Sequence, residues 1–515
     1  MSGNLFDLIR SRIPSAQKTF LEMADGGRIS YGELLARSGQ VANILVLRGV
    51  SPGDRVAVQV EKSPENLVLY LAVLRAGAVY LPLNTAYTLS ELDYFIADAE
   101  PALIVCDPAK RDGIAAVANR YGSPAVETLG ANGEGSLTQA AATAPADFAD
   151  VPREDDDLAA ILYTSGTTGR SKGAMLTHRN LSSNALTLVD YWRFTGDDVL
   201  LHALPIYHTH GLFVAANTLL LAGGSMIFLP KFDADEILRL LPKATSLMGV
   251  PTFYTRLLQR PALDRALCAH MRLFTSGSAP LLAETHREFK ARTGHAILER
   301  YGLTETGMNT SNPYDGDRIA GTVGFPLPDV ELRIADADTG RVLPQGENGI
   351  IEVKGPNVCA GYWRMPEKTK AEFRPDGFFI TGDIGKIDER GYVHIVGRAK
   401  DLIITGGFNV YPKEIETEID SLPGVVESAV IGCPHPDFGE AVTAVVVCQK
   451  GASVTESAVI DALNGRVAKF KLPKRVLFAD DLPRNSMGKV QKNVLREQNK
   501  GLYAMASEAR RSQPA

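Results

Sequence analysis

Hydrophobic and polar positions follow two different periods in the first part of the chain. An S-x-x-E pair that begins at Ser30 is typical of a helix start, and apolar residues continue at helical spacing to Gly49. Val56 and Val58 then alternate as in a strand, residues 63–77 form a second helix pattern, and the segment AVYLPL forms a second strand. A strand–helix–strand unit predicts a parallel sheet that helices cover on both faces.

The pattern continues with strands at 102–107 (ALIVCD) and 225–230 (SMIFLP), while residues 128–157, rich in Gly, Ala, Thr and Pro, predict a surface excursion. From about Gly391 the pattern of predicted elements changes. GYVHIVG, ESAVIGC and AVTAVVVC predict strands, and PKEIETEID and SAVIDALNGRVA predict amphipathic helices. We therefore predict an α/β fold. A large N-terminal domain of mixed and parallel sheets with flanking helices, residues 1–399, precedes a small mobile α+β C-terminal domain, residues 400–515.

Composition narrows the function. The chain has 515 residues. Because a single hydrophobic core stops growing at about 250–300 residues, we expect more than one domain. Its net charge is −6 and it has no basic stretch, so we expect no nucleic-acid partner. Its most apolar stretch, residues 67–83, is interrupted by Arg75 and Gly77, so we expect no membrane span. The five cysteines show no C-x-x-C spacing. With no signal-peptide core at the N-terminus, they predict free thiols in a cytoplasmic protein without a zinc site.

The segment LYTSGTTGRSKGAML, residues 162–176, combines glycines, hydroxyl side chains and two cations beside a strand pattern. Glycines let successive backbone N–H groups turn inward as an anion site, and Lys172 adds a positive charge. The alternative is a plain glycine-rich turn. A Walker A loop is excluded, because Lys172 lies between Ser171 and Gly173 and not in a G-K-[ST] sequence. We interpret the segment as a different phosphate-binding loop.

Seven segments in order give this loop a context. They are YTSGTTGRSKGAMLTH, LPIYHTHGL (204–212), TSGSAPL (275–281), RYGLTETG (300–307), FFITGD (378–383), GRAKDLIITGGFNVYPKEIE (397–416) and LPRNSMGKVQK (482–492). Together they resemble the motifs of the adenylate-forming superfamily, which includes acyl-CoA synthetases, adenylation domains and firefly luciferase. The ERYGLTE segment is most similar to the malonyl-CoA synthetases. The resemblance implies that ATP and a carboxylic acid give an acyl adenylate, which coenzyme A then converts to a thioester.

The resemblance assigns residues to these steps. Lys489 draws the carboxylate and the α-phosphate together, Thr304 contacts the α-phosphate, and Glu305 with Thr164 holds Mg²⁺. Asp383 accepts hydrogen bonds from the ribose hydroxyls. Lys400 is the hinge about which the small domain rotates, and the glycine pair 406–407 lines the pantetheine channel. The expected nucleotide- and CoA-binding set is Thr164, Ser165, Gly166, Thr167, Thr168, Gly169, Lys172, Gly277, Ser278, Ala279, Pro280, Tyr301, Gly302, Asp383, Arg398, Lys400, Gly406 and Gly407.

The acid itself is indicated by Arg300, which precedes the Tyr-Gly pair where many relatives have a small residue. A guanidinium in a closed pocket needs an anion, which predicts a short dicarboxylate, malonate or methylmalonate. The alternative is that Arg300 pairs with an acidic neighbour and only supports the sheet. Thr209 and Met308 are expected to set the pocket width beside Ser278. His208 is either a catalytic gate near the carboxylate or a packed histidine.

Other functions stay open at this point. The runner-up is an acyl-CoA synthetase for another short- or medium-chain acid, and further alternatives are transfer to a carrier protein and a non-catalytic nucleotide sensor. No carrier domain follows Lys489 and no cysteine lies in a motif, which favours coenzyme A as acceptor. We expect a monomer or homodimer. Because bacterial relatives can be silenced by acylation of the motif lysine, a protein acetyltransferase acting on Lys489 is an expected partner.

Overall fold

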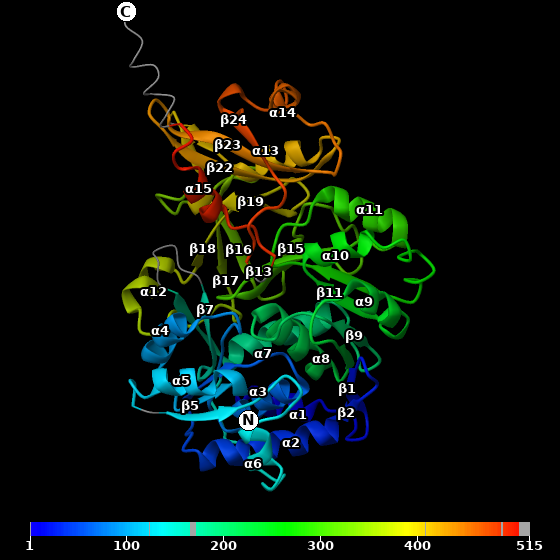
Figure 1. The fold of residues 1–515 in the computed structure, drawn as a ribbon, viewed down its shortest axis with the longest axis vertical. Coiled ribbons are helices and arrows are strands. Elements are labelled where there is room, and N and C mark those ends of the chain that lie inside the picture. Colours follow the sequence, from blue (N-terminus) through cyan, green and yellow to red (C-terminus); the bar gives the residue numbers. More distant parts are fainter. Residues whose placement is uncertain (1, 123, 165–170, 407, 486–487, 504–515) are drawn as a thin grey trace, which may run out of the picture.

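The computed structural model describes residues 2–122, 124–164, 171–406, 408–485 and 488–503. Figure 1 shows a large lower body, coloured blue to yellow, and a smaller upper domain in orange and red. This arrangement confirms the predicted α/β fold with a small C-terminal domain. The predicted boundary at 399/400 falls in a short 3₁₀ turn, Ala399–Asp401 (η4), between the last strand of one sheet and the first strand of the next.

One sheet of the large domain has six strands in the order β6-β5-β3-β4-β7-β8, of which only the β7–β8 pair is antiparallel. The capping box at Ser30 is present, and the strand–helix–strand unit predicted from it onward is confirmed. The strands and the helices near them are α2 (Tyr31–Leu47), β3 (Arg55–Gln59), α3 (Pro64–Arg75), β4 (Val79–Pro82), α4 (Leu89–Ala99), β5 (Leu103–Cys106), η1 (Pro108–Lys110), α5 (Arg111–Ala118), β6 (Ala125–Thr128), β7 (Leu158–Thr164) and β8 (Lys172–Thr177).

A second sheet has nine strands in the order β15-β14-β13-β12-β11-β9-β10-β1-β2, with a parallel centre and antiparallel edges. Its elements are α1 (Leu5–Ser11), β1 (Thr19–Met23), β2 (Arg28–Ser30), α7 (His178–Tyr191), β9 (Val199–His202), the π-helix η2 (His210–Ala216), α8 (Asn217–Ala222), β10 (Ser225–Phe228), α9 (Ala234–Leu240), η3 (Leu241–Lys243), β11 (Ser246–Gly249), α10 (Pro251–Leu258), β12 (Leu273–Ser276), α11 (Ala283–Thr293), β13 (Leu298–Leu303), β14 (Gly307–Ser311) and β15 (Phe325–Pro326). The parallel strands β9, β11, β12 and β13 end on the same edge, which is where ligands bind in open α/β sheets.

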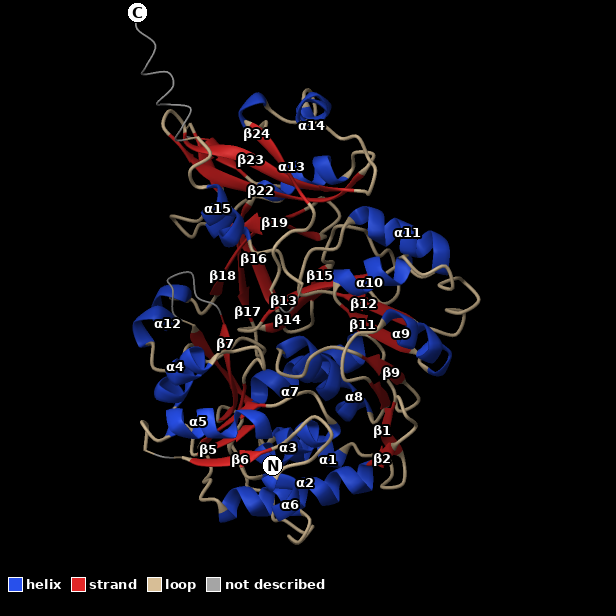
Figure 2. Ribbon diagram, viewed as in Figure 1, coloured by secondary structure: helices blue, strands red, loops and turns tan. Residues whose placement is uncertain are grey.

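The core lies between these two sheets. Helix α3 is buried over nearly its whole length because it packs inside the domain, and Figure 2 shows it among other helices in the lower body. The stretch 67–83 is therefore core helix and strand, as predicted. None of the helices in the described residues is long and apolar enough to cross a membrane. The predicted excursion at 128–157 also contains a short helix, α6 (Ser136–Ala141), which buries Leu137 and Ala141.

Two antiparallel-rich sheets complete the chain (Figure 2). The first is formed by β16 (Glu331–Ala335), β17 (Gly349–Lys354), β18 (Phe379–Ile387) and β19 (Val393–Arg398), with α12 (Pro366–Glu372) beside it. The C-terminal sheet and its helices are β20 (Ile403–Thr405), β21 (Phe408–Val410), α13 (Pro412–Asp420), β22 (Val425–His435), β23 (Gly439–Cys448), α14 (Glu456–Leu463), η5 (Lys469–Lys471), β24 (Arg475–Ala479) and α15 (Lys492–Asn499).

The structure differs from the sequence prediction at one helix end. The pattern SAVIDALNGRVA predicts a helix that continues beyond Leu463, but α14 ends at Leu463. The reason is Gly465, which adopts a φ of 85°, a left-handed conformation that ends a helix. All five cysteines are described and unpaired, which confirms the predicted free thiols.

Candidate active site

A cavity of about 880 Å³ lies where the ends of the large domain's strands meet the small domain. It gathers side chains that are far apart in the sequence, from the end of β7 to the loop before α15. Among the residues predicted for the site, it is lined by Thr164, Lys172, His208, Thr209, Ser278, Arg300, Gly302, Thr304, Glu305, Met308, Arg398, Lys400 and Lys489.

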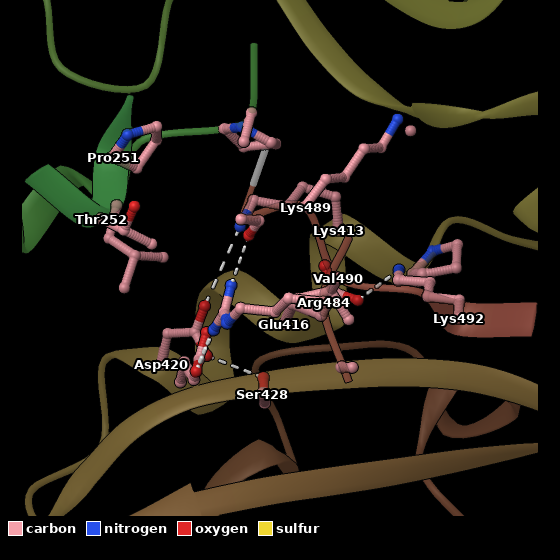
Figure 3. A pocket seen from close by; sticks show the side chains of 18 of the residues that line it. Pro251, Thr252, Lys413, Glu416, Asp420, Ser428, Arg484, Lys489, Val490 and Lys492 are labelled. Atoms are coloured by element: carbon pink, nitrogen blue, oxygen red, sulfur yellow. Dashed lines mark hydrogen bonds and ion pairs between the residues drawn. The ribbon is translucent and has the colours of Figure 1, made fainter. Parts of the chain in front are cut away.

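A second cavity of about 340 Å³ adjoins the first, because Arg398 and Lys489 line both. It contains the predicted residues Ala279, Pro280 and Asp383. Figure 3 shows Lys489 between Pro251 and Thr252 of the large domain and the helix that carries Asp420. Charged side chains from both domains therefore line two neighbouring cavities.

The phosphate-loop end of the large cavity brings Thr164 and Lys172 beside Glu305. The Thr164 hydroxyl lies 3.2 Å from Glu305 Oε1. Lys172 Nζ lies 2.9 Å from Glu372 Oε1 and 4.3 Å from the centroid of the Tyr362 ring. The predicted residues Ser165, Gly166, Thr167, Thr168 and Gly169 fall within 165–170, outside the described residues.

The sequence analysis missed two residues at this end of the cavity, Tyr362 and Glu372. The Tyr362 hydroxyl lies 3.2 Å from Glu305 Oε1 and also donates to Glu372, so it bridges two carboxylates. Burial, followed by the charge of Glu305, raises the pKa of Tyr362, which keeps its proton available for donation. The sequence shows Tyr362 only as an aromatic residue in the segment GYW. Nothing in the sequence indicates that it lies beside Glu305, from which it is separated by 57 residues.

The second cavity contains a hydrogen-bonded group centred on Asp383, on β18. Tyr301 donates from its hydroxyl to Asp383 Oδ2 at 2.6 Å, and Arg398 Nε lies 2.6 Å from Asp383 Oδ1. Asp383 and Arg398 are register partners across the β18–β19 pair, so the backbone ladder sets this ion pair. Each carboxylate oxygen keeps a further lone pair, which leaves Asp383 able to accept from a ligand hydroxyl.

Lys489 is a half-buried cation that lines both cavities. Burial, followed by the nearby charge of Arg398, lowers its pKa to about 8. Two hydrogen bonds within the loop stabilise the position of Lys489. The Lys489 amide donates to Asn485 Oδ1 at 2.9 Å, and Arg484 Nη1 donates to the Gly488 carbonyl at 2.8 Å. Lys400, the predicted hinge residue, is exposed at the rim of the cavity.

Arg300 is a buried side chain in the lining of the large cavity. It is 4% exposed, its Nε and Nη2 have no hydrogen-bond partner, and no acidic group of the described residues pairs with it. The alternative interpretation, an internal ion pair, is therefore wrong for the described part of the chain. Burial lowers its pKa to about 9, so it stays a cation at neutral pH. An uncompensated buried cation facing a cavity is an anion site.

Histidines surround this guanidinium. His210, which the sequence reasoning missed, lies with Nδ1 3.2 Å from Ser278 Oγ, and its backbone amide donates to His208 Nδ1 at 3.3 Å. Burial, followed by the charge of Arg300, lowers the pKa of His208 to about 4 and that of His210 well below its ordinary value. Both rings are therefore neutral at pH 7. The second histidine of the H-T-H segment was the available signal for His210.

The remaining predicted residues have other surroundings. Gly277 lines neither cavity; a Cβ at this position would clash with the Arg300 guanidinium, so the glycine makes room for that side chain. Thr209 and Met308 line the cavity beside Arg300. Gly406 is exposed on the small domain and lines neither cavity, and Gly407 lies outside the described residues.

The chain and its fold are similar to those of known proteins. The structure is similar to ATP-bound MatB from Rhodopseudomonas palustris, with 70% sequence identity and a TM-score of 0.96 over 98% of this chain and 100% of that one. A feruloyl-CoA synthase from an Amycolatopsis species is 36% identical over 478 residues, 92% of this chain and 94% of that protein. The mitochondrial malonate–CoA ligase ACSF3 of Mus musculus is 35% identical over 532 residues, 95% of this chain and 89% of that protein.

Two family models match the chain itself. The AMP-binding enzyme model matches residues 13–363, and the AMP-binding enzyme C-terminal domain matches residues 414–489. These matches confirm the resemblance to the adenylate-forming superfamily that the seven segments predicted. The chain therefore belongs to the family of AMP-binding enzymes.

Proposed function

We propose that this protein is an AMP-forming acid–thiol ligase that converts malonate, ATP and coenzyme A to malonyl-CoA, AMP and pyrophosphate. In the first step a carboxylate oxygen of malonate attacks the α-phosphorus of ATP, and the bond to pyrophosphate breaks. In the second step the CoA thiol attacks the acyl carbon, AMP leaves, and the thiol proton goes to solvent. The similarity to the malonate–CoA ligase ACSF3 supports this reaction class and acid, and the similarity to ATP-bound MatB supports ATP as a substrate.

The observation that carries the choice of acid is Arg300. Its guanidinium is buried, has two nitrogens without a partner, and faces the cavity that also holds Lys489. A dicarboxylate supplies the missing anion with one end and leaves the other free to react. A monocarboxylate would leave Arg300 unpaired, which is costly in a closed pocket.

The other cavity residues suit ATP. We propose that Lys172 contacts the β- and γ-phosphates, that Thr304 and Lys489 contact the α-phosphate, and that Asp383 accepts from the ribose hydroxyls while the 277–280 turn faces adenine. Positive groups aimed at the phosphate oxygens stabilise the charge that develops as pyrophosphate leaves. The close approach of Arg398 and Asp383 fixes the carboxylate for this contact.

Glu305 and Thr164 fit Mg²⁺. Their oxygens lie 3.2 Å apart and are the hard ligands that Mg²⁺ takes together with substrate phosphates. When bound, the ion neutralises charge on the triphosphate. We assign these two side chains to hold it.

The second step requires a rearrangement. Lys489 lines the large cavity in the present arrangement, and Gly406 lines neither cavity. We propose that the small domain, residues 400–515, rotates about Lys400 after adenylation, withdrawing Lys489 and bringing the 406–407 turn to the CoA thiol. The cytoplasmic location, the monomeric or dimeric state and an acetyltransferase acting on Lys489 stay predictions.

A panel of acids tests the proposed function. Purified protein with ATP, Mg²⁺ and CoA is given malonate, methylmalonate, acetate or a long-chain fatty acid, and pyrophosphate release is followed. We expect the highest kcat/KM with malonate, a lower value with methylmalonate and little turnover with the monocarboxylates. Preference for acetate or the long-chain acid would contradict the dicarboxylate assignment and favour the runner-up, another acyl-CoA synthetase.

A further inference from the structure

Lys62 is a buried lysine that none of the steps above uses. It follows β3 in the loop before α3 and is 8% exposed. The hydrogen bonds that it makes to described residues both go to His202 at the end of β9, 140 residues away. Burial holds the pKa of Lys62 well below its ordinary value, because its surroundings offer a cation little solvation. A group this costly to bury calls for a role.

The geometry fixes which way the hydrogen bonds run. His202 Nε2 lies 2.8 Å from the Gly211 carbonyl oxygen, which can only accept, so Nε2 carries the ring proton. Burial, followed by the charge of Lys62, lowers the pKa of His202 well below its ordinary value, which leaves the ring neutral and Nδ1 without a proton. Lys62 Nζ therefore donates to Nδ1 at 2.8 Å and also to the His202 carbonyl at 2.8 Å. Lys62 and the Gly211 carbonyl thus hold His202 in one tautomer from opposite sides of the ring.

His202 in turn holds the segment that forms the wall of the acid pocket. Gly211 is the second residue of the π-helix η2, a helix type that is frequent at functional sites. A Cβ at Gly211 would lie 2.8 Å from the carbonyl carbon of Pro205, so the chain folds back tightly between residues 205 and 211. This turn carries His208, Thr209 and His210, all of which line the large cavity beside Arg300.

We propose that Lys62 and His202 are positioning residues that hold the 205–211 turn at the distance from Arg300 that a short dicarboxylate requires. The inference rests on the proposed function, since it concerns the acid-binding end of that site. Neither residue lines the cavity, and each acts through the Gly211 carbonyl. Because a small displacement of a positioning wall weakens binding of the reacting group, the effect falls on the acid and spares the nucleotide.

The first test replaces Lys62 with methionine, which keeps the length of the side chain and removes the donor. We expect the KM for malonate to rise about tenfold while the KM for ATP and kcat change less than about twofold. The matched control is Lys18→Met. Lys18 likewise makes two hydrogen bonds, to the backbone carbonyls of Gly196 and Gly223, but at the other end of the same sheet, so malonate KM should not change.

A second pair of variants separates positioning from general support and replaces the first test if Lys62→Met does not fold. His202→Gln keeps an amide N–H that can reach the Gly211 carbonyl and should keep malonate KM within about threefold of the parent. His202→Leu loses this donor and should raise malonate KM about tenfold, as Lys62→Met does. Equal KM values in the Gln and Leu variants would overturn the inference.

Two further results would also overturn it: an unchanged malonate KM in folded Lys62→Met, or an equal rise in the KM values for malonate and ATP. These failures are distinct from failure of the proposed function. In that case the parent protein itself would show no malonate-dependent pyrophosphate release, whatever stands at position 62.

Discussion

At the scale of single residues, two cations that line the large cavity differ in their surroundings, since Arg300 is buried and Lys489 is half-buried. Two nitrogens of Arg300 have no hydrogen-bond partner among the described residues, and the side chain lines the large cavity. Lys489 lies on a loop of the small domain and reaches the same cavity from the other side. Opposite charges have to come from the ligands, a dicarboxylate for one and a triphosphate for both. The empty protein therefore carries excess positive charge where its substrates are expected to meet.

Replacing Arg300 tests the first of these roles. Arg300→Ala should raise the KM for malonate about a hundredfold, because a buried charge pair is lost, and should leave the KM for ATP unchanged. It should not lower the melting temperature, since no ion pair is broken in the free protein. Arg318 is the matched control. It donates to the backbone carbonyls of Pro313, Ala296 and Tyr314, so Arg318→Ala should lower the melting temperature without altering malonate KM. A destabilised Arg300→Ala with unchanged malonate KM would instead indicate a supporting role.

The pH dependence of the two half-reactions tests Lys489. Its lowered pKa of about 8 means that it is charged below pH 8 and loses its proton above. The kcat/KM for malonate-dependent pyrophosphate exchange should therefore fall about tenfold per pH unit above pH 8. Thioester formation from supplied malonyl adenylate should show no such fall. Lys489→Arg stays charged and should shift the decline to higher pH. An identical decline in Lys489→Arg would show that another group titrates.

The sequence predicted residue types well and residue partners poorly. Arg300, Lys489 and Asp383 were predicted from local segments, and the structure places all three in the lining of the two cavities. Lys62 could not be found in this way. Its partner His202 lies 140 residues away, and a lysine in a polar loop is normally solvated. Burial and pairing depend on how distant strands pack, which no local pattern contains.

At the scale of elements, the hairpin of β13 and β14 positions Thr304 and Glu305 between its strands. Gly302 and Met308 are register partners in this hairpin, and the two strands approach closely at Gly302. A Cβ there would clash with the Gly307 carbonyl and lie 2.5 Å from Met308 Cε. The glycine is therefore required for the hairpin itself, in addition to its place in the cavity wall.

Gly302→Ala tests this requirement. Because the clash is with backbone, the hairpin must open, and we expect a loss of about 2 kcal/mol or more in the free energy of unfolding. Gly196→Ala is the control in the same domain. Its Cβ would lie no closer than 3.4 Å to any neighbour, so stability should change by less than about 0.5 kcal/mol. Urea unfolding followed by circular dichroism measures both, and equal stability of the two variants would contradict the close approach.

The elements themselves were largely predictable. The capping box at Ser30 and helix α13 were predicted with the observed starts because their capping and periodicity signals are local. The overlong prediction for α14 failed where Gly465 turns left-handed, a local signal that the periodicity obscured. The sheet order could not be predicted, since β9 pairs with β10 and β11 through contacts between distant segments.

At the scale of the whole molecule, the proposed rotation of the small domain requires that the present arrangement be one of two. The contact between Thr252 on α10 and Gly488 beside Lys489 is a place to lock it. A Cβ at Gly488 would lie 3.9 Å from the Thr252 Cβ, within the range for a disulfide. The natural cysteines are unpaired and four of them are buried, which limits competing reactions.

The locked variant tests the rotation. Thr252→Cys with Gly488→Cys, once oxidised, should retain malonate-dependent pyrophosphate exchange and lose at least about ten-fold in thioester formation, because Lys489 stays in the cavity. Reduction should restore thioester formation. Each single cysteine variant, treated with the same oxidant, serves as control. Full thioester formation in the oxidised double variant would contradict a rotation between the two steps.

The most direct measurement of the central claim is the nucleotide product. Purified protein is incubated with ATP, Mg²⁺, CoA and malonate, and the products are separated by chromatography. We expect AMP, pyrophosphate and malonyl-CoA in equal amounts, because the carboxylate attacks the α-phosphorus. Formation of ADP and phosphate with malonate, or AMP formation that does not depend on the acid, would contradict it.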